Sequence, residues 1–422
     1  MTSEERKEAR YQRRKAKREA KAQKYAKTFD EVFSFGNLMA AGKRCCNGVR
    51  WKASAINFEV FLARECAGIL AEIRSGKHAF RGFQSFTTIE HGKARDIDAL
   101  PIRQRAAQKC LCQNLLTEMF SHSLVYDNAA SLPGRGMDFA LKRLKKHLRD
   151  HYRKHGTKGG IYQFDFKGYF LSIPHEGIKK RLREKIADAR LCALAESYVD
   201  DFRKMKTAPK EARGVGLGSE ISQIIALDYA SPIDHYIKDV CGIKGYGRYM
   251  DDGYVISGSL TELERIKGKL YELAKALGLR MNDKKNVITP FEGCSFKFLK
   301  MRVTLRESGR VTIKPSRQSL KTIRRKIVIF RRWLDAGKMK AEDVFQSYQS
   351  WRAHARRAES YGSLKTMDAR FAALFGAELA ARKLRFPCTL NARRFKNGWV
   401  YTPRYAGRRK AWNTSAIGHS GE

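Results

Sequence analysis

The sequence of 422 residues has no apolar run that approaches the roughly 20 residues needed to span a lipid bilayer. Its N-terminus also lacks the apolar segment that a secretory signal places behind its basic residues. These two absences predict a soluble protein that is not secreted. With 43% hydrophobic residues, the chain still has enough apolar material for two or three packed subdomains.

Paired cysteines are also absent. The nine cysteines are odd in number, are scattered from Cys45 to Cys388, and include no CxxC pair. A disulfide framework or a zinc ribbon would need regularly spaced pairs. The pattern excludes both and predicts reduced thiols, as in a cytosolic protein.

Acidic residues are few for a chain with this many basic ones. There are 43 Asp plus Glu against 85 Lys plus Arg, which leaves a formal net charge of +42. Such a surplus repels itself unless a polyanion neutralises it. The basic residues are spread over the whole chain rather than gathered in one cluster, which favours nucleic acid over an anionic membrane surface as the partner.

The N-terminal part of the chain has little chemistry of its own. Residues 1 to about 28 are basic and almost free of apolar side chains, so they predict a helix or a disordered arm that cannot bury a face by itself. An RNA-binding arm and a solvated tail both remain open. From Ser54 to about Gly76, a spacing of three or four predicts one amphipathic helix with an apolar stripe of Phe58, Leu62, Cys66, Ile69 and Ile73.

Between about residues 160 and 315 the sequence alternates short β-type runs with helical stretches. The β-type runs are YQFDF, YGRYMDDGYVI, FKFLKMRVTL and RVTI, and the helical stretches extend from Ile178 to Val199 and from Thr261 to Leu277. This alternation predicts an α/β sandwich with a central sheet.

After Pro315 the pattern predicts a small helical bundle. Ser316 can cap a first helix whose apolar stripe is Leu320, Ile323, Ile327, Phe330 and Leu334. The other face of that helix carries Lys321, Arg324, Arg325, Arg331 and Arg332. Two further helices are predicted through Val344, Tyr348, Trp351 and Ala355 and through Leu364, Met367, Phe371 and Leu374.

Three aspartates stand out because of their surroundings. Asp251 and Asp252 precede Gly253 between two β-type runs, and Asp-Gly is favoured in tight hairpin turns because glycine adopts positive φ without strain. Asp165 lies in a run of aromatic and β-branched residues typical of a buried strand, where a lone carboxylate is costly unless it is paired or bound to metal. If that strand lies beside the hairpin, the three carboxylates meet and could hold two Mg²⁺ ions for phosphoryl transfer.

Several blocks in this sequence resemble the successive motifs of reverse transcriptases, in the same order. The palm-like blocks are GIYQFDFKGYFLSIPH, GVGLGSEISQ, YGRYMDDGYVI, LGLRMNDKKNVI and KFLK, and the upstream blocks are GKARDIDALPIRQRAAQ and YDNAASLPGRGMDFAL. The resemblance covers about residues 45 to 375. It implies an α/β (α+β) right-hand polymerase fold with fingers, an RRM-like palm sheet and a helical thumb.

The resemblance also implies a division of the chain. Residues 1–50 would be a basic N-terminal extension and 51–160 the fingers. Residues 161–315 would form the palm, with a fingers insertion near 178–213, and residues 316–422 the helical thumb and a basic C-terminal tail.

By the same resemblance, the catalytic and metal-binding residues are Asp165, Asp251 and Asp252, with the backbone carbonyl of Phe166 as a further metal ligand. The cofactor would be two Mg²⁺ ions, for which Mn²⁺ could substitute. Lys285 matches the lysine that protonates the departing pyrophosphate, although Lys284 beside it is an alternative.

The nucleotide-binding residues that the resemblance implies are Lys93, Arg95, Phe166, Phe170, Leu217 and Gln223. Lys93 and Arg95 would contact the triphosphate or, alternatively, the template backbone. Phe170 would exclude a 2′-hydroxyl, unless it is only core packing. Leu217 stands where many reverse transcriptases carry Gln, which puts ordinary base-selection fidelity in doubt.

The remaining implied contacts are with primer and RNA. Phe298, Leu299 and Lys300 match the primer grip. Besides Arg324, Arg325 and Arg331, the C-terminal tail interleaves cations with aromatic rings, among them Arg393, Arg394, Trp399 and Tyr405. This composition suits RNA binding by stacking, but the rings could equally anchor the tail to the thumb.

Among reverse transcriptases, the chain most resembles the bacterial unknown-group, defence-associated enzymes, and within them the type 2 branch. The resemblance implies a cytoplasmic bacterial enzyme that copies a dedicated structured noncoding RNA into cDNA from dNTPs, in antiphage defence. The alternatives are an error-prone enzyme of a diversity-generating retroelement, an RNA-dependent RNA polymerase, and a non-catalytic RNA-binding scaffold.

Overall fold

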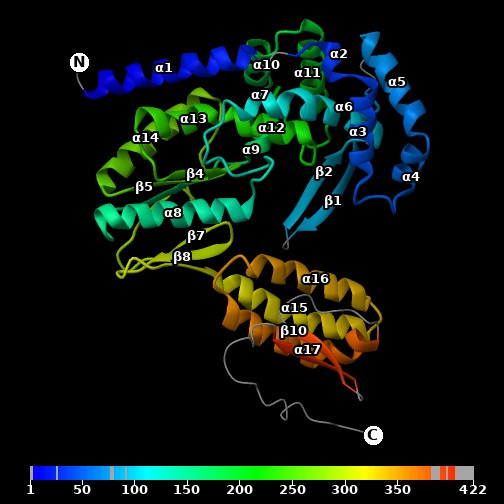
Figure 1. The fold of residues 1–422 in the computed structure, drawn as a ribbon, viewed down its shortest axis with the longest axis vertical. Coiled ribbons are helices and arrows are strands. Elements are labelled where there is room, and N and C mark those ends of the chain that lie inside the picture. The colour runs from blue at the N-terminus through cyan, green and yellow to red at the C-terminus, as the bar shows by residue number, and fades with distance from the viewer. Residues whose placement is uncertain are drawn as a thin grey trace. The chain divides into compact units, whose positions relative to one another are not determined.

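The computed structural model describes residues 3–24, 27–76, 80–90, 93–381, 390–395 and 398–403. The chain divides into two compact units (Figure 1). The first comprises Met1–Cys294 and Leu305–Val311, and the second comprises Ser295–Thr304 and Thr312–Glu422.

The first unit is built around a four-stranded antiparallel sheet of order β4-β5-β3-β6. The strands are β3 (Gly160–Phe164), β4 (Tyr246–Tyr249), β5 (Asp252–Ser257) and β6 (Val287–Pro290). Helices α8 (Met137–His155) and α14 (Leu260–Ala276) cover opposite faces of this sheet (Figure 1). Strand β3 lies between β5 and β6, and because helices cover the sheet, its side chains are mostly buried on both faces, as the aromatic run predicted.

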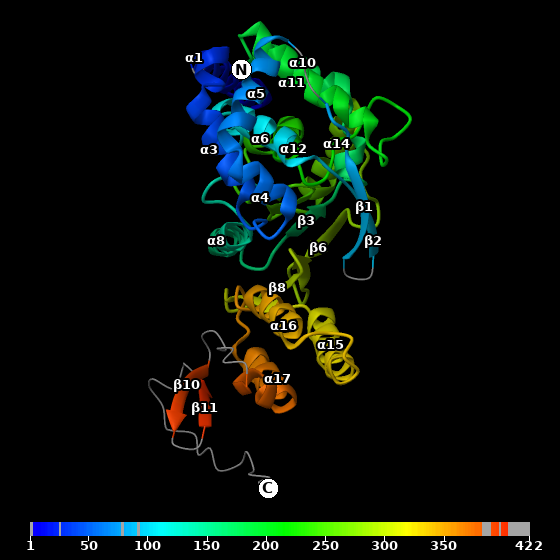
Figure 2. The same ribbon diagram turned by 90° about the vertical axis from the view of Figure 1, so that its right-hand side faces the viewer.

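Helices from the N-terminal and middle parts of the chain extend the core of this unit. They comprise α2 (Phe29–Val32), α3 (Phe35–Cys46), α4 (Ala53–Val60), α5 (Leu62–Arg74), α6 (Ile102–Leu111), η1 (Cys112–Leu116), α7 (Thr117–Ser121), α9 (Tyr169–Ser172), α10 (His175–Lys185), α11 (Ala189–Asp201), η2 (Phe202–Lys204), α12 (Glu220–Tyr229), α13 (Ser231–His235) and η3 (Tyr236–Val240). A hairpin of β1 (Gln84–Glu90) and β2 (Lys93–Ala99) projects from this unit (Figure 2).

The N-terminal segment forms a helix, α1 (Ser3–Lys24), that contacts η3. Arg14 Nη1 donates to Asp239 Oδ1 at 2.8 Å. The alternative of a wholly disordered arm is therefore wrong for this stretch. This ion pair joins the helix to η3, and the sequence of the helix offers almost no apolar face.

Two predicted helices are each divided in the structure. The stretch from Ser54 to Gly76 forms α4 and α5, which are separated at Phe61. The stretch from Ile178 to Val199 forms α10 and α11, because the Asp188 side chain accepts hydrogen bonds from the first backbone N–H groups of α11 and so begins a new helix.

The second unit consists of a three-stranded sheet and a helical bundle. The sheet contains β7 (Phe296–Phe298), β8 (Met301–Leu305) and β9 (Val311–Pro315), and the helices are α15 (Arg317–Asp335), α16 (Ala341–Ala355) and α17 (Tyr361–Ala381). Ser316 caps α15 as predicted, and Ile323, Ile327 and Phe330 are buried in the bundle. Strands β10 (Leu390–Phe395) and β11 (Gly398–Pro403) form a separate hairpin.

The structure also bears on the predictions about membrane spans and cysteine pairing. Within the described ranges, no helix is both long enough and apolar enough to cross a membrane. The eight cysteines in those ranges are free, which agrees with the predicted reduced thiols, and Cys388 lies outside the described residues.

Candidate active site

The turn between β4 and β5 presents two of the three aspartates. Tyr249 pairs with Asp252, so Met250 and Asp251 form a two-residue turn. Met250 has a φ of 56°, while Asp251 keeps a negative φ, which is the type II′ pattern that normally takes glycine at its first central position. A methionine in that conformation stores strain of about 1–3 kcal/mol, and such strain is typical of functional sites.

Gly253 has a different role from the one predicted. It lies in β5, outside the turn, and its φ is not positive. A Cβ atom at this position would lie 2.1 Å from Cζ of Phe164 on the neighbouring strand. Glycine is therefore needed for the close approach of β3 and β5, and the prediction that it supplies the turn's positive φ is wrong.

The third aspartate reaches the turn through strand pairing. Phe164 pairs with Gly253, which brings Asp165, the next residue along the chain, to the end of β5 that carries Asp252. Asp165 is only 3% exposed and shares a hydrogen bond with the Asp252 side chain. The strand of Asp165 thus lies beside the β4–β5 hairpin, which is the condition under which the three carboxylates were expected to meet.

A short segment before β6 supplies the polar partners of Asp165. Lys285 Nζ donates to Asp165 Oδ2 at 2.6 Å, and Asn282 Nδ2 donates to Oδ1 at 2.8 Å. Asn286 Nδ2 donates to the backbone carbonyl of Asp165 at 3.2 Å. Lys284 is exposed and makes none of these contacts, so the geometry favours Lys285 of the two candidate lysines.

The electrostatics of the site reflect crowded carboxylates. Burial, the charge of Asp251 and the hydrogen bond with Asp165 raise the pKa of Asp252 to about 7. Burial and the charge of Asp165 also raise the pKa of Asp251. Burial alone would lower the pKa of Lys285, but the hydrogen bond to Asp165 and the three carboxylate charges raise it overall.

The donor chemistry of this site fits a divalent cation. Three carboxylates and the backbone carbonyl of the buried Phe166 provide only oxygen ligands, the type that Mg²⁺ prefers. In the described part of the chain, however, no three His, Cys, Asp or Glu side chains are arranged so that they could hold a metal ion as they stand. Lys285 and Asn282 each donate to one oxygen of Asp165, so in this arrangement they compete with a cation for that carboxylate.

The predicted nucleotide-binding residues lie on several elements. Lys93 and Arg95 lie in the extended strand β2, and only their backbone is described. Phe170 on α9 is partly buried and packs against the core, with its ring edge-on to Tyr169 at 6.0 Å. Leu217 is partly exposed in the segment before α12.

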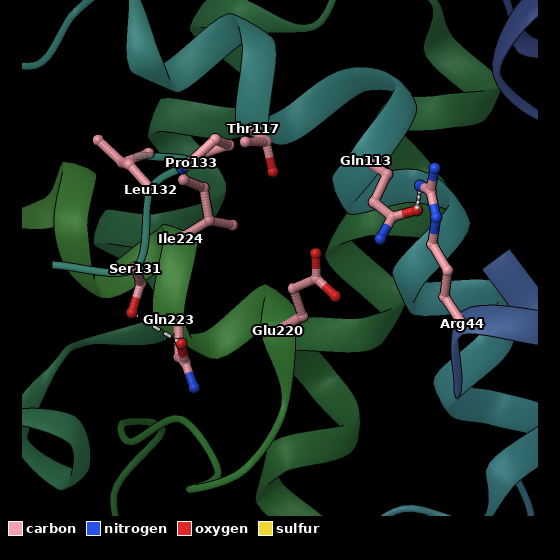
Figure 3. Close-up of a pocket in the computed structure, with 9 residues that line it drawn as sticks. All are labelled: Arg44, Gln113, Thr117, Ser131, Leu132, Pro133, Glu220, Gln223 and Ile224. Atoms are coloured by element: carbon pink, nitrogen blue, oxygen red, sulfur yellow. Dashed lines mark hydrogen bonds between the residues drawn. The ribbon is translucent and has the colours of Figure 1, made fainter. Parts of the chain in front are cut away.

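Gln223 lines a cavity of 440 Å³ between α12, the chain at Ser131–Pro133 and α3 (Figure 3). Ser131 Oγ donates to Gln223 Oε1 at 2.8 Å. The remaining lining residues are Arg44, Gln113, Thr117, Leu132, Pro133, Glu220 and Ile224. The structure thus joins Gln223 to the upstream block YDNAASLPGRGMDFAL, which contains Ser131.

The residues predicted to grip the primer form a strained hairpin in the second unit. Phe298 pairs with Met301, so Leu299 and Lys300 make the two-residue turn between β7 and β8. Both have positive φ, 48° and 63°, without being glycine. This is a second turn at a predicted functional position where non-glycine residues adopt a costly conformation.

The predicted RNA-binding residues have different surroundings. Arg324 and Arg325 are exposed on α15, whereas Arg331 is half-buried and donates to Asp335 at 2.9 Å and to the carbonyl of Leu374 on α17 at 3.0 Å. Arg393, Arg394 and Trp399 lie in β10 and β11, where only the backbone is described. Tyr405 lies outside the described residues.

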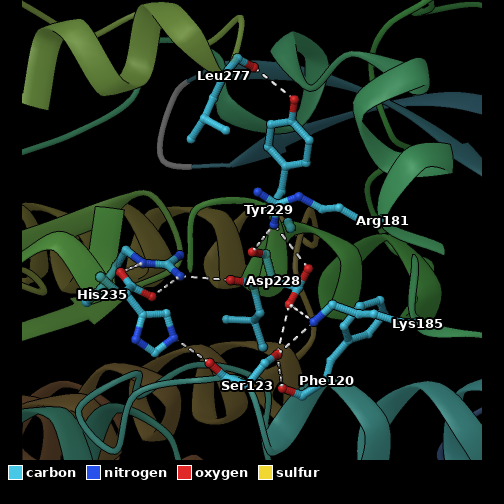
Figure 4. Close-up of polar contacts among 12 residues, drawn as sticks. Phe120, Ser123, Arg181, Lys185, Asp228, Tyr229, His235 and Leu277 are labelled. Carbon is cyan, nitrogen blue, oxygen red and sulfur yellow. Dashed lines mark hydrogen bonds and ion pairs between the residues drawn. The ribbon is translucent and has the colours of Figure 1, made fainter. Parts of the chain in front are cut away.

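A buried polar network around Asp228 could not be predicted from the sequence (Figure 4). Asp228 accepts from Ser123 at 3.0 Å, from Lys185 at 3.1 Å and from Arg181 at 3.1 Å, and it thereby ties α10 to the end of α12. Burial would raise the pKa of Asp228, but the charges of Lys185 and Arg181 lower it overall. Sequence spacing gives no signal for such a network, because its members lie more than forty residues apart.

Asn282 and Asn286 were also missed as partners of Asp165. A signal was present, since NDKKN follows a predicted helix and places Asn282, Lys285 and Asn286 three and four residues apart. A compact turn can bring such residues to one side. Only the structure shows that this side faces Asp165.

The antiparallel sheet with aspartates at adjoining strand ends is the arrangement expected of a polymerase palm. Residues 85–303, a little over half of the chain, match the family described as reverse transcriptase (RNA-dependent DNA polymerase). The chain therefore belongs to the reverse transcriptase family, as the sequence blocks predicted.

One solved structure similar to this chain is an apo telomerase from Candida tropicalis, truncated from its C-terminal domain. The match has 14% sequence identity and a TM-score of 0.43 and covers 56% of this chain. The chain spans 55% of the length of that telomerase chain. No curated protein sequence matches this chain.

Proposed function

We propose that this chain is an RNA-directed DNA polymerase that copies a dedicated structured noncoding RNA into cDNA. The observation that carries the proposal is the convergence of Asp165, Asp251 and Asp252, through paired strands, with Lys285 against Asp165. The family match and the net charge of +42 support a nucleic-acid template and product. A role in bacterial antiphage defence is supported by the resemblance to the unknown-group enzymes.

The residues of the site suit nucleotidyl transfer. Asp165, Asp251 and Asp252, with the carbonyl of Phe166, would hold two Mg²⁺ ions, which supply charge stabilisation at the attacking and leaving oxygens. In the reaction, the primer 3′-hydroxyl gives up its proton to solvent water, its oxygen bonds to the α-phosphorus of the dNTP, and the bond from that phosphorus to the pyrophosphate oxygen breaks. Lys285 holds a proton at Nζ, since its pKa is raised, and we assign it to protonate the leaving pyrophosphate.

Other side chains would position the substrates. Lys93 and Arg95 on β2 would contact the triphosphate, and Phe170 would pack beneath the sugar and exclude a 2′-hydroxyl. Phe298, Leu299 and Lys300 would hold the primer end. The exposed Arg324 and Arg325 on α15, together with the C-terminal tail, would contact RNA phosphates.

The proposal is tested by sequencing the nucleic acids that co-purify with the protein from its native host. The wild type is compared with the double variant Asp251→Ala/Asp252→Ala and with the control Asp283→Asn, whose carboxylate accepts from Tyr271 instead of lying in the site. We expect one noncoding RNA to dominate in all three samples, and its complementary DNA to disappear only in the double variant. Diverse bound RNA, with DNA unchanged by the double variant, would contradict the proposal and favour an RNA-binding scaffold.

A further inference from the structure

The guanidinium of Arg248 contacts the turn that carries Asp251. Arg248 lies in β4, two residues before Met250, and its side chain is fully buried. Its Nη1 donates to the backbone carbonyl of Met250 at 2.9 Å. A buried arginine this close to the turn is not explained by template or substrate binding, because nothing in solution can reach it.

The hydrogen bond from Arg248 reaches a carbonyl in the middle of the turn. Met250 and Asp251 are the two central residues of the turn, so the Met250 carbonyl belongs to its central peptide. Turns of type I′ and type II′ differ in the orientation of this peptide. A donor fixed on the Met250 oxygen therefore selects one orientation and, with it, the direction in which Asp251 leaves the backbone.

Arg248 is itself held rigidly from two further elements. Nε and Nη2 each donate to one oxygen of Asp234 on α13 at 2.7 Å, and Nη2 also donates to the carbonyl of Leu227 on α12 at 2.8 Å. The hydroxyl of Tyr246 donates to Asp234 as well. A planar guanidinium bound on three sides has little freedom, so the Met250 carbonyl meets a donor of fixed position.

We propose that Arg248 is a positioning residue that holds the strained Met250–Asp251 turn in its metal-binding orientation. The inference rests on the proposed function, because it assigns Arg248 to the same site. Asp234 and Tyr246 act one step further away by fixing Arg248. Arg248 touches neither substrate nor metal, and it acts only through the turn.

The second unit contains a Tyr–Asp–Arg set of the same kind, which serves as a matched control. Arg352 donates through Nε and Nη2 to the two oxygens of Asp368 at 2.8 and 3.0 Å, and the Tyr348 hydroxyl donates to Asp368 at 2.7 Å. Arg352 and Asp368 are as buried as Arg248 and Asp234. Replacing either Tyr–Asp–Arg set with apolar residues removes a buried ion pair without stranding one charge.

The experiment compares Tyr246→Phe/Asp234→Leu/Arg248→Met with Tyr348→Phe/Asp368→Leu/Arg352→Met in the full-length chain. Steady-state primer extension gives kcat and the KM for dNTP, and electron paramagnetic resonance gives the affinity for Mn²⁺ that is lost in Asp251→Asn/Asp252→Asn. In the first triple variant we expect kcat to fall at least about tenfold and Mn²⁺ to bind about tenfold more weakly, with the KM for dNTP within about threefold. The second triple variant should keep all three values.

A second substitution in the turn distinguishes loss of turn positioning from general destabilisation of the fold. Adding Met250→Gly to the first triple variant lets the turn adopt positive φ without strain, so we expect Mn²⁺ affinity to recover by about threefold or more. If the triple variant does not fold, Arg248→Lys takes its place. Its single ammonium cannot bind Asp234 in the same forked manner and also reach the Met250 carbonyl, so the same weakening is expected.

The inference is overturned if Mn²⁺ affinity and kcat are as high in the Arg248 variants as in the Arg352 variant. It is also overturned if Met250→Gly does not restore the Mn²⁺ affinity that the first triple variant loses. The Mn²⁺ measurement does not depend on DNA synthesis. If the wild type extends no primer, the proposed function fails. The role of Arg248 is then decided by whether its variants bind Mn²⁺ more weakly than the Arg352 variant does.

Discussion

At the scale of single residues, Gly253 is a point of close approach between the β4–β5 hairpin and β3. Alanine there would force a Cβ against the ring of Phe164, so we expect Gly253→Ala to lower the free energy of unfolding by about 1–3 kcal/mol and to disturb the site. Gly268 in α14 is the matched control, since a Cβ there meets nothing within 4 Å. Gly268→Ala should raise stability by about 0.5–1 kcal/mol. Denaturant unfolding measures both, and equal effects would contradict this account of Gly253.

His147 on α8 gives the fold a pH dependence. It is buried beneath Tyr254, whose hydroxyl lies 2.9 Å from Nδ1, and burial lowers the pKa of His147 to about 4 despite the opposing charge of Asp127. The positive charges of Lys238 and Arg143 act in the same direction as burial, and Asp150 opposes it. Unfolding restores the usual pKa of 6.5, so the unfolded state binds more protons between these values.

The resulting stability is complete above pH 6.5 and is lost as the pH falls toward 4. We expect the wild type to lose up to about 3 kcal/mol over this range relative to His147→Gln, which cannot titrate. Urea unfolding at several pH values measures the difference. A difference between wild type and variant that does not change with pH would show that His147 is not held neutral.

At the scale of elements, the β7–β8 hairpin combines strain with a predicted primer contact. Leu299→Asn/Lys300→Gly supplies residues that accept positive φ, so we expect the free energy of unfolding to rise by about 1 kcal/mol. If these side chains grip the primer, the KM for primer should rise at the same time while that for dNTP stays the same. A stabilised variant with unchanged primer KM would leave Leu299 and Lys300 as an ordinary turn.

The sequence predicted most strands and helices from local pattern, but it joined two pairs of helices into single ones. The four β-type runs became β3, the β4–β5 hairpin, the β7–β8 hairpin and β9, because aromatic and β-branched residues alternate between glycines. The breaks at Phe61 and before Asp188 were missed because the apolar spacing continues across each of them. Asp188 was itself a readable cap signal.

In the candidate active site, too, local sequence pattern identified some residues and missed others. The aspartates could be recognised from their motifs, but the role of Gly253 depends on which residue of β3 faces it. Arg248 and Asp234 are fourteen residues apart, and alternation along a strand does not tell which charged side chain is buried with a partner. Such assignments need strand register and packing, which no local pattern contains.

At the scale of the whole molecule, the net charge of +42 should make RNA binding strongly dependent on salt concentration. If binding engages six to ten phosphates, RNA affinity should fall about 10³-fold or more between about 50 and 200 mM salt. Replacing Lys321, Arg324 and Arg325 on α15 with Gln should lower the slope of log affinity against log salt by about 0.7–0.9 for each phosphate that the variant no longer neutralises. A slope unchanged in this variant would place the RNA-binding surface elsewhere on the chain.

The central claim is that Asp165, Asp251 and Asp252 together make one centre for nucleotidyl transfer. Single-turnover extension of a primed RNA template, titrated with Mg²⁺, tests it most directly in Asp165→Asn, Asp251→Asn and Asp252→Asn, with Asp283→Asn as control. We expect each of the three variants to lose at least about 10³-fold in rate while still binding the primed template, and the control to keep its rate. Any one of the three within about tenfold of the wild type would remove that carboxylate from the centre and contradict the account.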